Sequence, residues 1–144
     1  MVQLRLSASS VPADLSLSNL PLRFADALCL APKTFWALNG QPWPSRSHEV
    51  LPPPLFTFRR GRTYVIEVVN QTPHIHPIHL HGHTFKLISS SKSDVLPHFA
   101  DTTIVAPKER VKIAFVADNP GDWMIHCHII EHQETGMMGI YRVV

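Results

Sequence analysis

The sequence predicts an all-β domain, a Greek-key sandwich or barrel of roughly seven short strands. Two observations lead to this class. Short segments rich in β-branched residues alternate in polarity, and turn signals separate them at intervals of about 8–12 residues. A chain of 144 residues with 44% hydrophobic content supplies one core of ordinary size. We therefore expect a single folded domain.

The N-terminal part carries weaker signals. Residues 1–33 show no sustained period and are predicted to be a linker or an early strand, with the domain proper at residues 34–144. A weak pattern at residues 20–30 would also allow a short helix. The N-terminus lacks the basic start and apolar core of a secretory signal, and no stretch reaches the ~20 apolar residues of a membrane span. The only basic run, at residues 59–62, suits a turn, and a formal charge of +2 does not support nucleic-acid binding.

From residue 35 onward, strand and turn signals follow one another. Residues 35–38 form a strand that runs into an Asn39-Gly40 turn, and prolines then mark an extended loop. Residues 63–70, dense in β-branched side chains, form the clearest strand. The other predicted strands are residues 55–58, 84–88, 101–106, 111–116, 123–129 and 139–144. We expect residues 101–106 and 111–116 to pair as a hairpin.

A cysteine between two histidines organises the C-terminal part of the chain. His126-Cys127-His128 is followed by His132, five residues after the cysteine, and by Met137, five residues later again. If residues 123–129 form a strand, Cys127 faces one side of the sheet and both flanking histidines face the other. One strand would then serve two metal sites, one inside the domain and one on its outer face.

A second histidine cluster lies upstream, in the segment His-Pro-Ile-His-Leu-His-Gly-His at residues 76–83. By the same alternation His79, His81 and His83 share one face, and His76 falls on the opposite face. This cluster can supply the histidine that the inner site of the first cluster still needs.

The combination of cysteine, histidine and methionine favours copper. A single buried histidine is usually a structural residue, but seven histidines and one cysteine in two alternating clusters are not explained in that way. A zinc site explains the pattern better than structural histidines do, because zinc also takes imidazole and thiolate ligands. Met137 argues for copper, since zinc seldom takes a thioether whereas blue copper sites use one as a weak axial ligand.

The two motifs, His-Pro-Ile-His-Leu-His-Gly-His and His-Cys-His-x3-His-x4-Met, resemble the copper signature of the multicopper oxidases, and more closely their C-terminal cupredoxin domain. The resemblance runs from about residue 35 to the end of the chain. The methionine-bearing ending at residues 135–138 is similar to bacterial members, the laccase and cuprous-oxidase group, rather than to fungal laccases. Further points of similarity are Asn39-Gly40, Asn70, Asp101-Thr102 and Asn119-Pro120-Gly121.

The resemblance implies a cupredoxin-like fold and a role for each motif residue. A type 1 copper, which takes electrons from a phenolic or metal-ion donor, would be held by His76, Cys127, His132 and Met137. Its hydrophobic shell would come from Ile78, Ile130 and Met138. Electrons would then pass through Cys127 and its flanking histidines to a trinuclear cluster that reduces oxygen to water. That cluster would take a type 2 ligand from His79 and type 3 ligands from His81, His126 and His128.

The family's trinuclear cluster takes eight histidines, and this chain supplies four. The resemblance therefore implies another cupredoxin domain or subunit with the missing His-x-His pairs, and a periplasmic or secreted protein. Two function classes follow: a multicopper oxidase domain that is incomplete as a lone monomer, or a stand-alone cupredoxin electron carrier without oxygen reduction. The intact outer His-x-His pairs favour the oxidase, because a carrier has no use for them.

The remaining candidate groups receive supporting roles or none. Cys29 is expected to be a buried apolar residue or a free thiol, because a ligand thiolate at Cys127 cannot also form a disulfide. Asp101 suits either a carboxylate that orients a ligating histidine or a turn cap. Structural or supporting roles are expected for His48, His74, His83 and His98.

Overall fold

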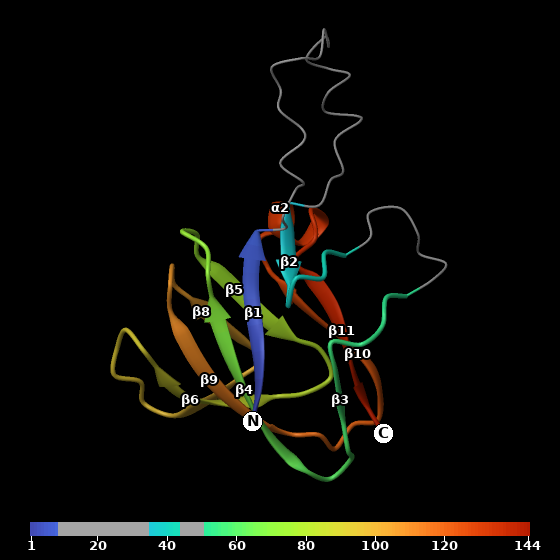
Figure 1. Cartoon of the computed structure of the whole chain (residues 1–144). Coiled ribbons are helices and arrows are strands. Elements are labelled where there is room, and N and C mark those ends of the chain that lie inside the picture. Colours follow the sequence, from blue (N-terminus) through green and yellow to red (C-terminus); the bar gives the residue numbers. More distant parts are fainter. Residues whose placement is uncertain (9–34, 44–50) are drawn as a thin grey trace, which may run out of the picture.

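The computed structural model describes residues 1–8, 35–43 and 51–144 of the chain. Within these residues, strands form two sheets and a single short helix follows the strand that carries Cys127 (Figure 1). The predicted all-β class is confirmed. No helix of the described part has the length and apolar character that a bilayer crossing requires.

The first sheet has six strands in the order β2-β1-β4-β9-β6-β7. Their bounds are β1 Val2–Ala8, β2 Trp36–Leu38, β4 Thr63–Asn70, β6 Phe85–Ser90, β7 His98–Ala100 and β9 Arg110–Val116. β1 pairs parallel with β4 and antiparallel with β2, and it buries Leu4 and Leu6 completely. The N-terminal residues thus provide an early strand inside this sheet. The short helix considered at residues 20–30 lies outside the described residues.

The second sheet has five strands in the order β3-β11-β10-β5-β8. Their bounds are β3 Phe56–Phe58, β5 His76–Leu80, β8 Thr102–Val105, β10 Gly121–Cys127 and β11 Met138–Val143, and helix α2 spans Ile130–Glu134. β10 and β5, the two strands that carry the histidine clusters, are antiparallel neighbours. His126 lies opposite His79, and Cys127 lies opposite Ile78. This register brings two distant motifs into one site.

The predicted hairpin between residues 101–106 and 111–116 is wrong. β8 pairs with β5 in the five-stranded sheet, whereas β9 pairs with β4 and β6 in the other sheet. The connection crosses between the sheets, and Glu109 fixes it by accepting hydrogen bonds from the Ala106 N–H (2.5 Å) and from the Ser90 hydroxyl. Alternation predicts that a segment is a strand, but it does not choose the strand's partner.

The core lies between the two sheets and follows the period-two alternation of their strands. In β4 the even-numbered residues from Ile66 onward are buried, and in β5 His76, Ile78 and Leu80 are buried. The largest fully buried side chains include Leu4, Leu6, Phe58, Ile66, Ile78, Phe85, Ile113, Met137 and Tyr141. The expected Asn-Gly turn follows β2, with positive φ angles of 52° at Asn39 and 75° at Gly40.

Candidate metal centre

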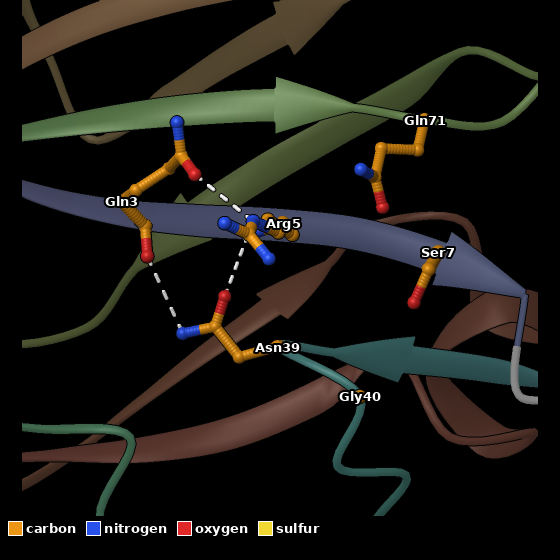
Figure 2. Close-up of a pocket in the computed structure, with 6 residues that line it drawn as sticks. All are labelled: Gln3, Arg5, Ser7, Asn39, Gly40 and Gln71. Atoms are coloured by element: carbon orange, nitrogen blue, oxygen red, sulfur yellow. Dashed lines mark hydrogen bonds between the residues drawn. The ribbon is translucent and has the colours of Figure 1, made fainter.

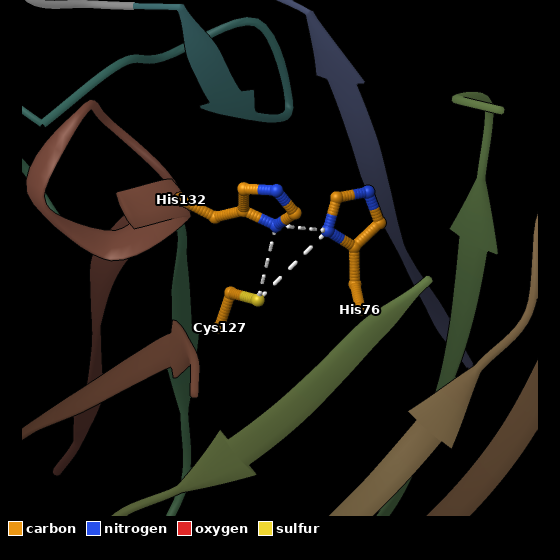
Figure 3. Close-up of side chains that lie close together, drawn as sticks. All are labelled: His76, Cys127 and His132. Carbon is orange, nitrogen blue, oxygen red and sulfur yellow. Dashed lines mark hydrogen bonds between the residues drawn. The ribbon is translucent and has the colours of Figure 1, made fainter. Parts of the chain in front are cut away.

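His76, Cys127 and His132 bring their ligand atoms together inside the domain (Figure 3). The two Nδ1 atoms lie 3.1 Å apart, and Cys127 Sγ lies 3.8 Å from His76 Nδ1 and 3.7 Å from His132 Nδ1. Within the described residues, this is the only trio of histidine, cysteine or carboxylate side chains whose ligand atoms all lie within 4.8 Å of one another. All three residues are buried.

The positions of these three side chains follow from the local structure. His76 opens β5 and Cys127 closes β10, so both point into the core from neighbouring strands. Helix α2 then carries His132 back over the cysteine. Met137 closes this loop with its backbone, because its N–H donates to His132 O (2.8 Å) and its carbonyl accepts from Cys127 N–H (3.0 Å). The Met137 side chain is fully buried.

The trio fits a three-coordinate metal ion. With metal–nitrogen bonds of about 2.0 Å and a metal–sulfur bond of about 2.3 Å, angles between about 100° and 125° give edges of about 3.1–3.8 Å. The three observed separations fall in this range. Two imidazoles and one thiolate are the strong donor set of blue copper, and the Met137 side chain is buried in the same core cluster as Cys127. The side chains therefore fit copper without rearrangement of the chain.

Burial favours the uncharged forms of these three side chains in the metal-free protein. Desolvation, with the neighbouring His132 and His74, lowers the pKa of His76 to about 4. Desolvation also lowers the pKa of His132, although Glu131 opposes the shift. Burial raises the pKa of the Cys127 thiol to about 11, and the Ile129 N–H, 3.4 Å from the sulfur, acts in the opposite direction. Both imidazoles thus keep a free lone pair at neutral pH.

Trp36 and Thr72 contact the trio, and the sequence analysis missed both. The Trp36 ring lies 4.5 Å from the His132 ring and 5.2 Å from the His76 ring, centroid to centroid. Thr72 Oγ1 lies 2.7 Å from His76 Nε2. The only available signals were an aromatic residue before the Asn-Gly turn and a hydroxyl four residues before His76. Ile130, expected in the hydrophobic shell, is 76% exposed, so that expectation is wrong.

The other four motif histidines gather on the opposite side of β5 and β10. His81 Nε2 and His126 Nε2 lie 3.0 Å apart, and the His79 ring lies 5.1 Å from the His128 ring and 5.6 Å from the His126 ring. His128 follows the last residue of β10 and is exposed, whereas His126 is 7% exposed. Desolvation is the main cause that lowers the pKa of His81, and the neighbouring histidines add to it. Desolvation also lowers the pKa of His126.

Backbone carbonyls orient two of these rings. His79 Nδ1 lies 2.9 Å from Asp101 O and 3.0 Å from Thr102 Oγ1, so its Nε2 remains free. His126 Nδ1 donates to the carbonyl of Cys127 at 3.0 Å, so its Nε2 points away from that residue. The Asp101 carboxylate is 3.8 Å from His79 Nδ1 and accepts a hydrogen bond from Thr102 instead. Asp101 thus orients the histidine through its carbonyl rather than through its side chain.

His83 does not share a face with His79 and His81, contrary to the alternation prediction. β5 ends at Leu80, and Gly82 turns the chain with a φ of +71°. His83 is therefore buried between the sheets, where its Nδ1 lies 2.7 Å from Tyr141 Oη and its Nε2 accepts from Asn119 N–H (3.3 Å). Alternation fails here because the strand had already ended.

The remaining candidates lie away from the ligand atoms or outside the described residues. The His74 ring packs edge-on against Trp36, with centroids 5.4 Å apart. His98 is exposed, and its Nδ1 lies 2.9 Å from Leu96 O. Cys29 and His48 lie outside the described residues.

A separate polar pocket lies beside β1 and the Asn39-Gly40 turn (Figure 2). Its polar groups largely satisfy one another: Asn39 Oδ1 accepts from Arg5 N–H at 2.7 Å, and Arg5 Nε donates to Gln3 Oε1 at 2.9 Å. Among the described residues, no histidine, cysteine or carboxylate lines it, and none of the three inner-trio residues does. Its lining residues are Gln3, Arg5, Ser7, Asn39, Gly40 and Gln71.

Comparisons with known proteins converge on one family. The model of the family described as "Multicopper oxidase" matches residues 26–144. Multicopper oxidase MmcO of Mycobacterium tuberculosis is 43% identical over 103 residues, which are 71% of this chain and 18% of that protein. Iron transport multicopper oxidase fio1 of Schizosaccharomyces pombe is 32% identical over 99 residues, 60% of this chain and 16% of that protein.

A solved structure gives the same result for the fold. The multicopper oxidase of Pseudomonas thermotolerans superimposes with a TM-score of 0.78 at 30% identity, over 100% of this chain and 29% of that one. The chain thus spans less than a third of the length of each of these relatives.

Proposed function

This chain belongs to the multicopper oxidase family as a cupredoxin-like domain, and we propose that it works in a laccase-like oxidase that couples oxidation of a donor to reduction of oxygen to water. Copper is the cofactor that the family implies. When bound, it would supply one-electron chemistry at the inner site and, at the outer site, the reduction of oxygen. We assign the domain to residues 34–144 together with β1, which lies inside the six-stranded sheet between β2 and β4.

His76, Cys127 and His132, with Met137 as a weak axial ligand, would hold the type 1 copper. Their burial supports this assignment, because a buried set of neutral imidazoles offers free lone pairs to a metal ion and disfavours a proton. The Trp36 ring covers His132 and His76 and so shields this side of the pocket.

His79 would serve as a type 2 ligand, and His81, His126 and His128 as type 3 ligands. The register of β5 and β10 supports this part of the proposal, since it brings four imidazoles together on one face. Cys127 joins the two sites. Its thiol belongs to the inner trio, while its carbonyl accepts the hydrogen bond of His126 Nδ1, so one residue links both ligand sets.

The missing half of the outer site requires a partner. Four histidines are half of the set that the family's trinuclear cluster takes, and the relatives are more than three times as long as this chain. We infer that another cupredoxin domain or subunit supplies the remaining His-x-His pairs. The name of the fission yeast relative supports a metal ion as electron donor, and a small phenol is the other candidate. A periplasmic or secreted location belongs to the same proposal.

The mutual approach of His76, Cys127 and His132 is the observation that carries this proposal. The deciding experiment loads the chain with copper, counts the metal, and records optical and paramagnetic resonance spectra. We expect the copper-loaded chain by itself to show an intense thiolate-to-copper band. We expect oxygen uptake only after a domain that carries the missing histidines is added. A colourless protein that prefers zinc would contradict the proposal. A blue protein that never consumes oxygen in the reconstituted mixture would instead indicate a stand-alone electron carrier.

A further inference from the structure

Asn70, the last residue of β4, is 1% exposed and uses every polar atom of its side chain. Its Nδ2 donates to the carbonyls of His74 (2.7 Å), Ala106 (2.9 Å) and, more weakly, Val105 (3.2 Å). Its Oδ1 accepts from the N–H of Thr72 at 2.9 Å. Three carbonyls on one side and an N–H on the other fix the orientation of the amide. The flipped amide would point its oxygen at the carbonyls and its NH2 group at the N–H.

The fixed amide determines the hydroxyl direction of Thr72, which is 3% exposed. Thr72 Oγ1 lies 2.8 Å from Asn70 Oδ1, an acceptor, so the hydroxyl must donate there; the alternative acceptor, His74 O, lies at 3.3 Å. A hydroxyl has one proton and two lone pairs. Its lone pairs therefore receive the N–H of His74 at 3.1 Å and the Nε2 of His76 at 2.7 Å.

An acceptor at this position admits only one arrangement of the His76 ring: Nε2 carries the proton and Nδ1 carries the lone pair. Nδ1 is also the atom that faces Cys127 Sγ and His132 Nδ1. We propose that Thr72, oriented by Asn70, is a positioning residue that selects the Nε2–H tautomer of His76 and so presents its Nδ1 to the metal. This inference rests on the proposed function, in which His76 is a metal ligand.

The direct test is the tautomer of His76 in the metal-free protein, read from long-range proton–nitrogen correlation spectra and assigned with His76→Gln. We expect the Nε2–H form in the native chain. Thr72→Val removes the hydroxyl at nearly constant volume and should let the Nδ1–H form appear, whereas Thr72→Ser should restore the native spectrum. An Nδ1–H ring in the native chain would overturn the inference, even if Thr72→Val fails to fold.

Copper affinity gives the second readout. Groups that orient a ligating histidine typically contribute a factor of about 10–100 in metal affinity, so Thr72→Val should bind copper more weakly by about that factor and Thr72→Ser should bind nearly as tightly as the native chain. Thr103→Val is the matched control, because Thr103 is also buried but lies opposite Ile78 rather than at the His76 ring. It should leave both the tautomer and the affinity unchanged.

The outcomes separate this inference from the function on which it rests. If the native chain binds copper through His76 but Thr72→Val keeps the native tautomer and affinity, only the role of Thr72 is overturned. If His76→Gln binds copper as tightly and with the same colour as the native chain, the ligand assignment itself is overturned, and the positioning role falls with it.

Discussion

The Nδ1 atoms of His76 and His132 lie 3.1 Å apart although the residues are 56 positions apart in the sequence. At this distance one of the two nitrogens must carry a proton when no metal is bound. Since His76 Nε2 lies 2.7 Å from the Thr72 hydroxyl, we expect the shared proton on His132 Nδ1. In the metal-free protein the inner trio would then be neutral and internally hydrogen-bonded.

Metal binding should therefore release one proton from the inner site. Burial raises the pKa of Cys127 to about 11, so the group is a thiol at pH 8 and must lose its proton to become a ligand, whereas His132 only moves its proton from one ring nitrogen to the other. Zinc is a redox-inert probe of this step. Calorimetry in buffers with different ionisation enthalpies should give about one proton per inner site, and Cys127→Ser should give none. A value near two would contradict the neutral inner trio.

Substitutions in the two histidine sets should have separate effects. Cys127→Ser removes the thiolate and should abolish the blue colour and electron entry. His128→Ala should keep the colour and lose oxygen reduction, because the His128 ring lies beside the His79 and His126 rings and not in the inner trio. Absorption spectra and oxygen uptake of the reconstituted oxidase measure the two properties. If His128→Ala bleached the visible band, the assignment of ligands to faces would be wrong.

The metal-free protein should lose stability as the pH falls. Burial lowers the pKa of His76 from 6.5 to about 4, and it lowers the pKa of His83 and His126 as well. Between these values the unfolded chain binds protons that the folded chain does not, so the free energy of unfolding decreases as pH drops from about 6.5 toward about 4. Urea unfolding at pH 7.5 and pH 5 measures the change, which should be smaller in His76→Gln. Equal stability at both pH values would contradict this prediction.

Tyr141→Phe should destabilise the core beneath the outer histidines. Tyr141 Oη donates to the carbonyl of His81 (2.5 Å) and accepts from His83 Nδ1 (2.7 Å), and the residue is fully buried. The substitution leaves a buried donor and a carbonyl without a partner, which costs about 1–3 kcal/mol. Tyr64→Phe is the control: its hydroxyl accepts the Arg59 N–H at 2.9 Å in an exposed position, where water can replace it. Denaturant unfolding should show a clearly larger loss for Tyr141→Phe.

Gly136→Ala should disturb the end of the domain that carries the inner site. Gly136 has a φ of +121°, and an added Cβ would overlap the backbone carbonyl of Trp36, whose ring packs on His132. Gly61→Ala provides the comparison, since its φ is +75° but open space surrounds the position of the added Cβ. Left-handed strain alone costs about 1–2 kcal/mol, so Gly61→Ala should lose about that much and Gly136→Ala more. Thermal unfolding, together with copper affinity, would reveal the difference.

The sequence by itself determined much of the site. Strand alternation predicted that Cys127 and its flanking histidines lie on opposite sides of one strand. In the structure Cys127 lies close to His76 and His132, whereas the ring of His126 lies beside that of His79. Most of the strands were also predictable within a residue or two, because period-two alternation is a local property of the chain.

Only the tertiary structure decided which strands are neighbours. β8 and β9 are consecutive in the chain yet belong to different sheets, and the parallel partner of β1 is β4. The sequence also missed the turn at Gly82 that sends His83 into the core, and the contacts of Trp36 and Thr72 with the ligand rings. Alternation records which side of a strand is buried, whereas pairing and ring contacts depend on segments far away in the chain. The proposed ligands were therefore readable from local sequence, and the groups that contact their rings were not.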